Sequence, residues 1–185
     1  MNERAAKRAS YADLVALPDD VVGEILGGEL YTRPRPAPRH ASASSELGVV
    51  VGSEFSFRSG GRGGWRILDE PELHLGEDVV VPDIAGWRLP KLETLPDAPH
   101  IELAPDWVCE VLSPSTARVD RIVKQAIYAR EGVSHLWFVD PLARTVEVSE
   151  RREGSWSLAS AVADEASVAL PPFEALEFAL GRLWD

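Results

Sequence analysis

The sequence predicts an α/β (α+β) fold in which helices flank a central mixed β-sheet. Two nearly continuous apolar runs, 107–112 and 135–139, are typical of strands buried on both faces. The other strand-like runs occur in pairs or groups separated by two helical patterns, and this irregular order favours a mixed sheet over a strictly parallel one. A length of 185 residues, with no internal repeat, is consistent with a single domain over 1–185.

The N-terminal part predicts a short helix followed by a β-hairpin. The polar run Ser10–Asp13 resembles a capping box, and Pro18 ends the helix that it begins. Strand-like residues 21–26 and 29–32 then flank Gly27-Gly28, a typical hairpin signal. The proline-rich residues 33–39 are expected to run extended.

A second helix is expected over residues 40–57, because apolar residues recur there with helical spacing. The glycine-rich residues 60–64 end it and form a loop, since they lack the Gly-Lys-Ser/Thr ending of a phosphate-binding loop. Three β-like runs follow, and a proline-rich loop precedes the central strand. These segments are 65–68, 72–75, 79–87 and 90–105.

The second half predicts strand, helix, strand and a closing hairpin. The strand 107–112 leads through Ser113–Thr116, which supplies helix-capping side chains, into a helix over 117–131 closed by Gly132. The remaining expected elements are a strand at 135–139, a hairpin formed by 145–149 and 156–161, and a short terminal helix at 173–184.

Charge excludes a protein that coats DNA through a broad basic surface, because the net charge is −11. The acidity is regional: residues 1–66 carry a net +1 and residues 67–185 a net −12. The expected helix 117–131 is locally basic, with a net charge of +2. A polyanionic partner would therefore have to bind at a local basic region and not across the whole surface.

A single cysteine, Cys109, excludes an internal disulfide and a cysteine-based zinc site. The four histidines lack the spacing of zinc ligands, so a zinc site is not expected. No apolar run is long enough to span a bilayer and the start does not resemble a secretory signal. We therefore expect a cytoplasmic protein.

The candidate site consists of two carboxylates and a lysine. Glu110 stands inside an apolar strand, where an ionised carboxylate is costly unless it is paired or binds a metal. Asp83 follows Pro82 at the start of a neighbouring strand, and Lys124 shares a helical stripe with Asp120 and Tyr128. Such a set suits phosphodiester hydrolysis with a divalent metal ion, although Asp83 and Lys124 taken singly are also compatible with a turn residue and a solvated lysine.

The sequence also resembles a known family, the Uma-type restriction endonucleases, a bacterial branch of the PD-(D/E)xK nuclease superfamily. The resemblance covers about residues 10–150 and rests on Pro82-Asp83, on the run 110–116, and on the motifs that surround them. Those other motifs are Asp120, Lys124, Tyr128, Gly132-Val133, the run 136–141, the run 24–30 and His40. The resemblance implies a restriction-endonuclease-like fold in which Asp83 and Glu110 bind Mg²⁺ or Mn²⁺ and Lys124 serves the attacking water.

The sequence departs from the superfamily motif at Leu112, which stands where the lysine of ExK is expected. Lys124 would have to substitute for it from the following helix. Other polar residues could join the site, although capping or surface roles are the simpler interpretation: Glu24, Glu29, His40, Glu46 and Glu54.

The resulting prediction is a metal-dependent endonuclease that acts on DNA, with a homodimer suggested by analogy with enzymes that cut both strands. Two alternatives remain open from the sequence. One is a catalytically silent nuclease fold that binds DNA or protein, and the other is a metal-dependent hydrolase of a smaller substrate.

Overall fold

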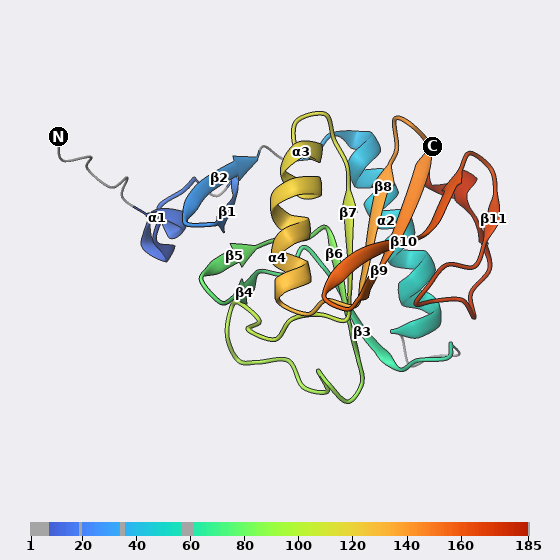
Figure 1. The fold of residues 1–185 in the computed structure, drawn as a ribbon, viewed down its shortest axis with the longest axis horizontal. Helices are drawn as coiled ribbons and strands as arrows, with labels where there is room; N and C mark the ends of the chain where they lie inside the picture. Colours follow the sequence, from blue (N-terminus) through green and yellow to red (C-terminus); the bar gives the residue numbers. More distant parts are fainter. Residues whose placement is uncertain (1–7, 19, 34–35, 57–60, 185) are drawn as a thin grey trace.

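The central feature of the fold is a six-stranded sheet with the order β10-β9-β8-β7-β6-β3 (Figure 1). The computed structural model describes residues 8–18, 20–33, 36–56 and 61–184. The sheet strands are β3 (Trp65–Asp69), β6 (Ile84–Arg88), β7 (Trp107–Val111), β8 (His135–Asp140), β9 (Thr145–Arg152) and β10 (Ser155–Ala163). Strands β7 and β8 pair in parallel and the other neighbours pair antiparallel, so the predicted mixed sheet is confirmed.

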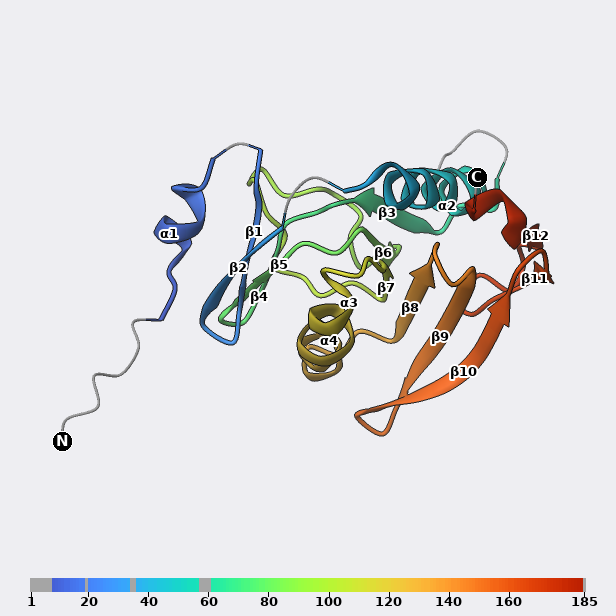
Figure 2. The same ribbon diagram turned by 90° about the horizontal axis from the view of Figure 1, so that it is seen from above.

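Helices cover both faces of this sheet (Figure 2). Helix α2 (Pro38–Phe55) lies on one face, and the segment α3–η1–α4 lies on the other. The residues of β7 alternate between these layers: Cys109 packs into the core formed with α2, whereas Val108 packs into the core formed with α4. Glu110 therefore points toward the α3–η1–α4 face, as the alternation predicts.

The predicted N-terminal hairpin is formed by β1 (Val22–Leu26) and β2 (Glu29–Arg33). It belongs to a second sheet of order β2-β1-β5-β4, completed by β5 (Asp78–Val80) and β4 (Leu73–Leu75). Both turn glycines, Gly27 and Gly28, have positive φ values of 63° and 85°, which most other residues rarely adopt. The hairpin is thus one half of a small sheet that abuts the central one.

The run 79–87, interrupted at Pro82 as the sequence predicts, forms the junction between the two sheets. Strand β5 ends at Val80, and β6 begins at Ile84 in the central sheet. Pro82 cannot donate a ladder hydrogen bond, so the pairing breaks at this position. Asp83 consequently stands where the two sheets meet.

The remaining helices agree with the sequence in position. Helix α1 (Tyr11–Val15) begins with the predicted capping box between Ser10 and Asp13. Helix α2 has Pro38 in its first turn, a position where the missing proline N–H costs no hydrogen bond. The C-terminal end expected for α2, residue 57, lies outside the described residues, as does the first part of the expected glycine loop.

The helix predicted over 117–131 contains a π-helical turn. It consists of α3 (Ala117–Val119), η1 (Asp120–Lys124) and α4 (Gln125–Arg130), and ends before Gly132, whose φ is 83°. Single π-turns inside α-helices are frequently found at functional positions. No helix among the described residues is both long and apolar enough to cross a bilayer.

The expected helix over 173–184 is wrong. Strand β12 (Phe178–Ala179) pairs with β11 (Ser167–Val168), and a 3₁₀ turn, η2 (Leu180–Leu183), follows. Phe178 and Leu180 are two residues apart and both are buried in the core beside α2. In an extended backbone, residues two positions apart point to the same side, so both side chains can enter this core. Tertiary packing therefore outweighs the local preference for a helix in this segment.

Candidate active site

Asp83, Glu110 and Lys124 come together in the structure, and each is at most 3% exposed. The antiparallel register pairs Ile84 with Cys109, so Asp83 lies beside the Glu110–Val111 end of β7. The backbone N–H of Val111 donates a hydrogen bond of 2.7 Å to Asp83 Oδ2. Strand pairing therefore fixes the two carboxylates relative to each other.

Lys124 points inward from η1, as its proposed role requires. Its Nζ lies 2.8 Å from Glu110 Oε1 and 3.2 Å from Glu24 Oε1. It also donates a hydrogen bond of 3.2 Å to the carbonyl oxygen of Val81, and Asp120 Oδ1 lies 3.7 Å away. The ammonium thus joins the helix to both sheets at their junction.

The stripe seen in the sequence, Asp120, Lys124 and Tyr128, faces this site. All three side chains are buried. The hydroxyl of Tyr128 donates a hydrogen bond of 2.5 Å to Glu110 Oε1, the same oxygen that contacts Lys124. One oxygen of Glu110 is therefore held by two donors from the helix.

Glu24 also belongs to the site, although the sequence favoured a surface position for it. It is 5% exposed, and its Oε1 accepts a 2.8 Å hydrogen bond from the backbone N–H of Val81. Strand β1 pairs with β5 at Ile25 and Val79, which brings Glu24 to the junction. The signal that could have found it is its place inside a strand-like run, the same signal that marked Glu110.

Two basic side chains contact Asp83. His40 Nε2 lies 3.3 Å from Asp83 Oδ2, and Arg33 Nη1 lies 3.3 Å from Asp83 Oδ1. Arg33 also donates to the carbonyl of Val81 and lies 3.5 Å from Glu70. His40 is thus part of the site rather than a surface residue, and Arg33 is a member that sequence spacing did not single out for this role.

The three other acidic candidates, Glu29, Glu46 and Glu54, contact side chains outside the site. Glu29 accepts a hydrogen bond from Tyr31. Glu46 pairs with Arg182 and Glu54 with Arg62. Leu112 is 3% exposed and packs in the core with α4, so the position of the ExK lysine is filled by an apolar contact.

Burial is the largest single influence on the pKa of Glu110, Asp83 and Lys124, but neighbouring charges reverse its effect at the last two. Burial raises the pKa of Glu110 to about 8, assisted by neighbouring carboxylates and opposed by Lys124. Burial also raises the pKa of Asp83, but the hydrogen bond from His40 and the charges of Arg33 and Lys124 outweigh it, and the net pKa is lowered. For Lys124 burial lowers the pKa, yet the surrounding carboxylates reverse this and leave it raised.

The donor set fits a hard divalent cation. Four buried carboxylates face one buried ammonium: Glu24, Asp83, Glu110 and Asp120 around Lys124. Within the described part of the chain, Glu110 Oε2 takes part in no hydrogen bond or ion pair, which leaves an oxygen for a ligand. Carboxylate oxygens are the ligands that Mg²⁺ prefers in proteins, so the residues present suit such an ion.

Two small hollows border the cluster, although Asp83, Glu110 and Lys124 do not line them. One of about 270 Å³ is lined by Arg33, His40 and the hydroxyl-rich residues 113–116, together with Pro36 and Ala37. The other, of about 150 Å³, reaches Glu24 and Asp120 and shares Arg33 with the first. A solvent-borne ligand can therefore approach from the side on which Arg33 lies.

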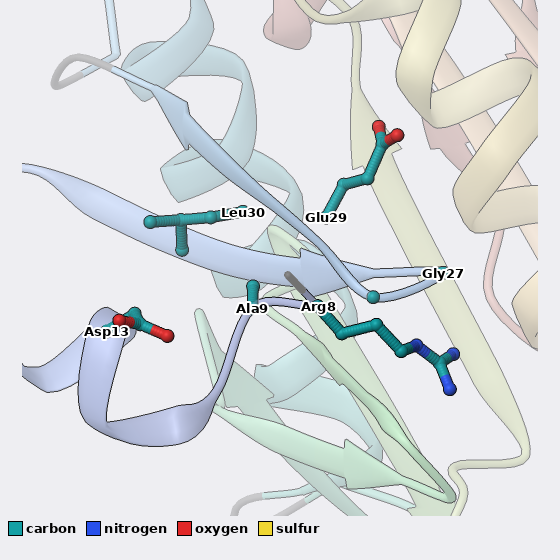
Figure 3. A pocket seen from close by; sticks show the side chains of 7 residues that line it. Arg8, Ala9, Asp13, Gly27, Glu29 and Leu30 are labelled. Carbon is teal, nitrogen blue, oxygen red and sulfur yellow. The ribbon is translucent and has the colours of Figure 1, made fainter. Parts of the chain in front are cut away.

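A larger open hollow of about 540 Å³ lies apart, beside the turn of the β1–β2 hairpin (Figure 3). Its lining includes Arg8, Gly27, Glu29 and Leu30, and, among the described residues, none that contacts Asp83 or Lys124. Figure 3 shows the side chains of Arg8 and Glu29 extending in different directions. This hollow offers no convergent set of polar groups comparable to the cluster around Lys124.

Comparisons with known proteins agree with this architecture. A model of the Uma2 family, described as "Putative restriction endonuclease", matches residues 9–181. A crystal structure described as "a putative nuclease belonging to DUF820", from Anabaena variabilis ATCC 29413, is similar with a TM-score of 0.76 and 22% identity. The match covers 95% of this chain and 97% of that one, and at this identity it shows the fold. No curated protein matches the chain.

Proposed function

The chain belongs to the Uma2 family, and on that premise we propose that it is a metal-dependent endonuclease that hydrolyses phosphodiester bonds in DNA. The observation that carries the proposal is the inward-pointing Lys124, whose Nζ lies 2.8 Å from Glu110 Oε1 beside Asp83. Two acids at adjoining strands and one buried ammonium are the groups that such chemistry needs. These groups meet because the two sheets and the π-turn converge at Pro82-Asp83.

In this proposal Asp83 and Glu110 would hold Mg²⁺ or Mn²⁺, and Glu24 contacts Lys124 and the N–H of Val81. The chemistry that such an ion supplies is polarisation of a phosphate oxygen and acidification of water. Tyr128 and Lys124 hold Glu110 Oε1, which orients its other oxygen. Val111 N–H and His40 orient Asp83 in the same manner.

Lys124 acts in the proposal as an ammonium. Its raised pKa keeps it protonated at neutral pH, so it donates hydrogen bonds rather than accepting a proton. A fixed positive charge can position the attacking water and stabilise negative charge that develops on the phosphate. Lys124 thereby takes the role of the ExK lysine, because Leu112 occupies the position of that lysine in the sequence.

DNA as substrate is supported by the groups around the smaller hollows. Arg33 provides a positive charge, and Ser113, Ser115 and Thr116 provide hydroxyls on the same rim. Arginines and hydroxyls of this kind are common phosphate contacts. Because most of the chain is acidic, the contact with DNA is expected to be local and to depend on this rim.

The proposal includes a cytoplasmic location and a homodimer that cuts both strands.

The wild-type protein distinguishes this proposal from its alternatives. A supercoiled plasmid is incubated with the protein in chelator, in Mg²⁺ or in Mn²⁺. In parallel, the retention of DNA by the protein is measured at increasing salt concentrations. The endonuclease nicks or linearises the plasmid only with metal. Salt-sensitive retention without cleavage would instead indicate a binding module. Neither cleavage nor retention would indicate a smaller substrate and contradict the proposal.

A further inference from the structure

The expectation that the histidines form no metal cluster needs revision for His74 and His100. These residues are far apart in the sequence, yet their rings stack with centroids 3.7 Å apart and an interplanar angle of 7°. Glu72 lies with them, and one ligand atom from each of the three residues falls within 4.8 Å of the others. This group, the Glu72–His74–His100 cluster, shares no residue with the site around Lys124.

Backbone hydrogen bonds fix the cluster in place. Leu73 and Ile101 form an isolated parallel bridge. The N–H of His74 donates to the carbonyl of Ile101 at 2.9 Å, and the N–H of Ile101 donates to the carbonyl of Glu72 at 2.9 Å. The loop that carries His100 is therefore tied to β4 on both sides of the cluster, so the three side chains are held together by the fold.

One nitrogen of the cluster has no partner. Nδ1 of His100 is buried and makes no hydrogen bond with any described residue. A buried polar atom that is left unpaired is costly, so native structures usually supply a partner for it. Its other nitrogen, Nε2, lies 3.7 Å from Glu102 Oε1. A histidine that binds metal through one nitrogen commonly directs the other at a carboxylate, and Glu102 lies near His100 Nε2, although at 3.7 Å the two do not form a hydrogen bond.

The remaining members are oriented in a similar way. His74 Nε2 lies 2.8 Å from Glu72 Oε1, and the hydroxyl of Tyr11 donates a 2.9 Å hydrogen bond to that same oxygen. The Tyr11 ring also packs edge-on against both imidazoles. The three ligand side chains are each about one quarter exposed or less. An ion can therefore reach them from solvent while most of the site remains shielded from water.

We propose that Glu72, His74 and His100 form a second metal site, selective for a transition-metal ion such as Zn²⁺, that fastens helix α1 to β4 through Tyr11. Two imidazoles and one carboxylate match the ligands that Zn²⁺ accepts, with a water in the fourth position. Bonds of about 2.0–2.2 Å require ligand atoms roughly 3.3 Å apart, so the stacked rings tilt toward each other on binding. The all-oxygen set around Asp83 favours a harder ion, which separates the two sites chemically.

The test is a calorimetric titration of the metal-stripped full chain with Zn²⁺ in excess Mg²⁺, which competes with Zn²⁺ for the proposed carboxylate site. The wild type is expected to bind one Zn²⁺ per chain. His74→Gln and His100→Gln should each abolish this saturable binding, and Tyr11→Phe should weaken it about tenfold or more, as loss of an outer-shell partner does. Circular dichroism of each variant verifies that it is folded.

The matched control is His135→Gln. His135 is another partly buried histidine whose Nδ1 has no partner among the described residues, but it stands on β8 away from Glu72. It should bind Zn²⁺ like the wild type. The proposal is overturned if the wild type shows no saturable Zn²⁺ binding. It is equally overturned if binding survives in folded His100→Gln and His74→Gln, or disappears in His135→Gln. None of these outcomes depends on nuclease activity.

Discussion

Lys124 Nζ and Glu110 Oε1 lie 2.8 Å apart in a buried ion pair that joins the π-turn η1 to the central strand β7. Both side chains are 2% exposed, so their charges are removed from water. The loss of hydration is costly, and further polar contacts must compensate it. Tyr128, Glu24 and the carbonyl of Val81 supply them. The pair is therefore one part of a network that spans the helix and both sheets.

Replacing Lys124 with methionine leaves Glu24, Glu110 and Asp120 without their shared ammonium. We expect the cleavage rate to fall by about 100-fold or more, because a preorganised donor is lost. We also expect the free energy of unfolding in chelator to fall by about 3–5 kcal/mol, because buried carboxylates lose their partner. Plasmid cleavage and urea denaturation measure the two effects.

The control for this substitution is Lys91→Met. Lys91 pairs with Asp106 at 3.0 Å, but its side chain is 35% exposed. Exposed pairs contribute little, so its unfolding free energy should change by less than about 1 kcal/mol and cleavage should be unchanged. Equal effects of the two substitutions would contradict the role given to Lys124.

Glu110 predicts an unusual dependence of stability on pH in chelator. Burial, aided by nearby carboxylates, raises its pKa to about 8 in the folded protein, from an ordinary value of 4.5. The folded state therefore binds this proton more tightly than the unfolded state. The associated stability is present at pH below the unfolded pKa and is lost as pH rises through about 8.

Urea denaturation across this range is expected to show wild-type stability decreasing from about pH 5 to about pH 8. Glu110→Gln has no such proton, so its decrease should be smaller. The lowered pKa of Asp83 contributes stability at pH above its ordinary value that is lost as the pH falls below it, so it does not produce the same trend. Parallel curves for wild type and Glu110→Gln would refute the pKa assigned to Glu110.

Arg33 should contribute to DNA binding because it lies between the two hollows that border the cluster. We expect Arg33→Ala to weaken binding across DNA sequences and to reduce the slope of log K against log salt by about one. Arg152→Ala is the control, since Arg152 is exposed beside the β9–β10 turn and pairs with Glu150. Binding measured in chelator at several salt concentrations tests this, and identical slopes for both variants and the wild type would contradict it.

Cys109 should be unreactive in the folded protein. It is fully buried in the core beside α2, and burial raises the pKa of its thiol well above the ordinary value. Alkylation depends on the thiolate, so iodoacetamide should modify Cys109 only after unfolding. Mass spectrometry over a urea series measures this. Rapid labelling without denaturant would show that β7 does not face α2 as described.

The sequence was sufficient to predict those parts of the site that depend on local pattern. Glu110 inside an apolar strand and the stripe of Asp120, Lys124 and Tyr128 both reflect side-chain periodicity, which the structure preserves. Asp83 was marked by its position after Pro82. The structure brings these groups together, whereas the catalytic roles assigned to them remain proposals.

The parts that could not be predicted depend on contacts between distant segments. Arg33 and Glu24 reach the cluster because the β1–β2 hairpin pairs with β5, and nothing in the hairpin itself indicates that pairing. His74 and His100 meet through the Leu73–Ile101 bridge. The C-terminal residues form β12 and a 3₁₀ turn because the core beside α2 accepts Phe178 and Leu180 together.

We propose that Asp83 and Glu110 form a metal-dependent cleavage centre. The most direct test compares plasmid cleavage in Mg²⁺ and Mn²⁺ by wild type, Asp83→Asn and Glu110→Gln, purified identically. Glu46→Gln, which alters an acidic residue on α2 outside the cluster, serves as the control. We expect metal-dependent cleavage by the wild type and Glu46→Gln and none by Asp83→Asn or Glu110→Gln. Cleavage by folded Asp83→Asn and Glu110→Gln at the wild-type rate would contradict the proposal.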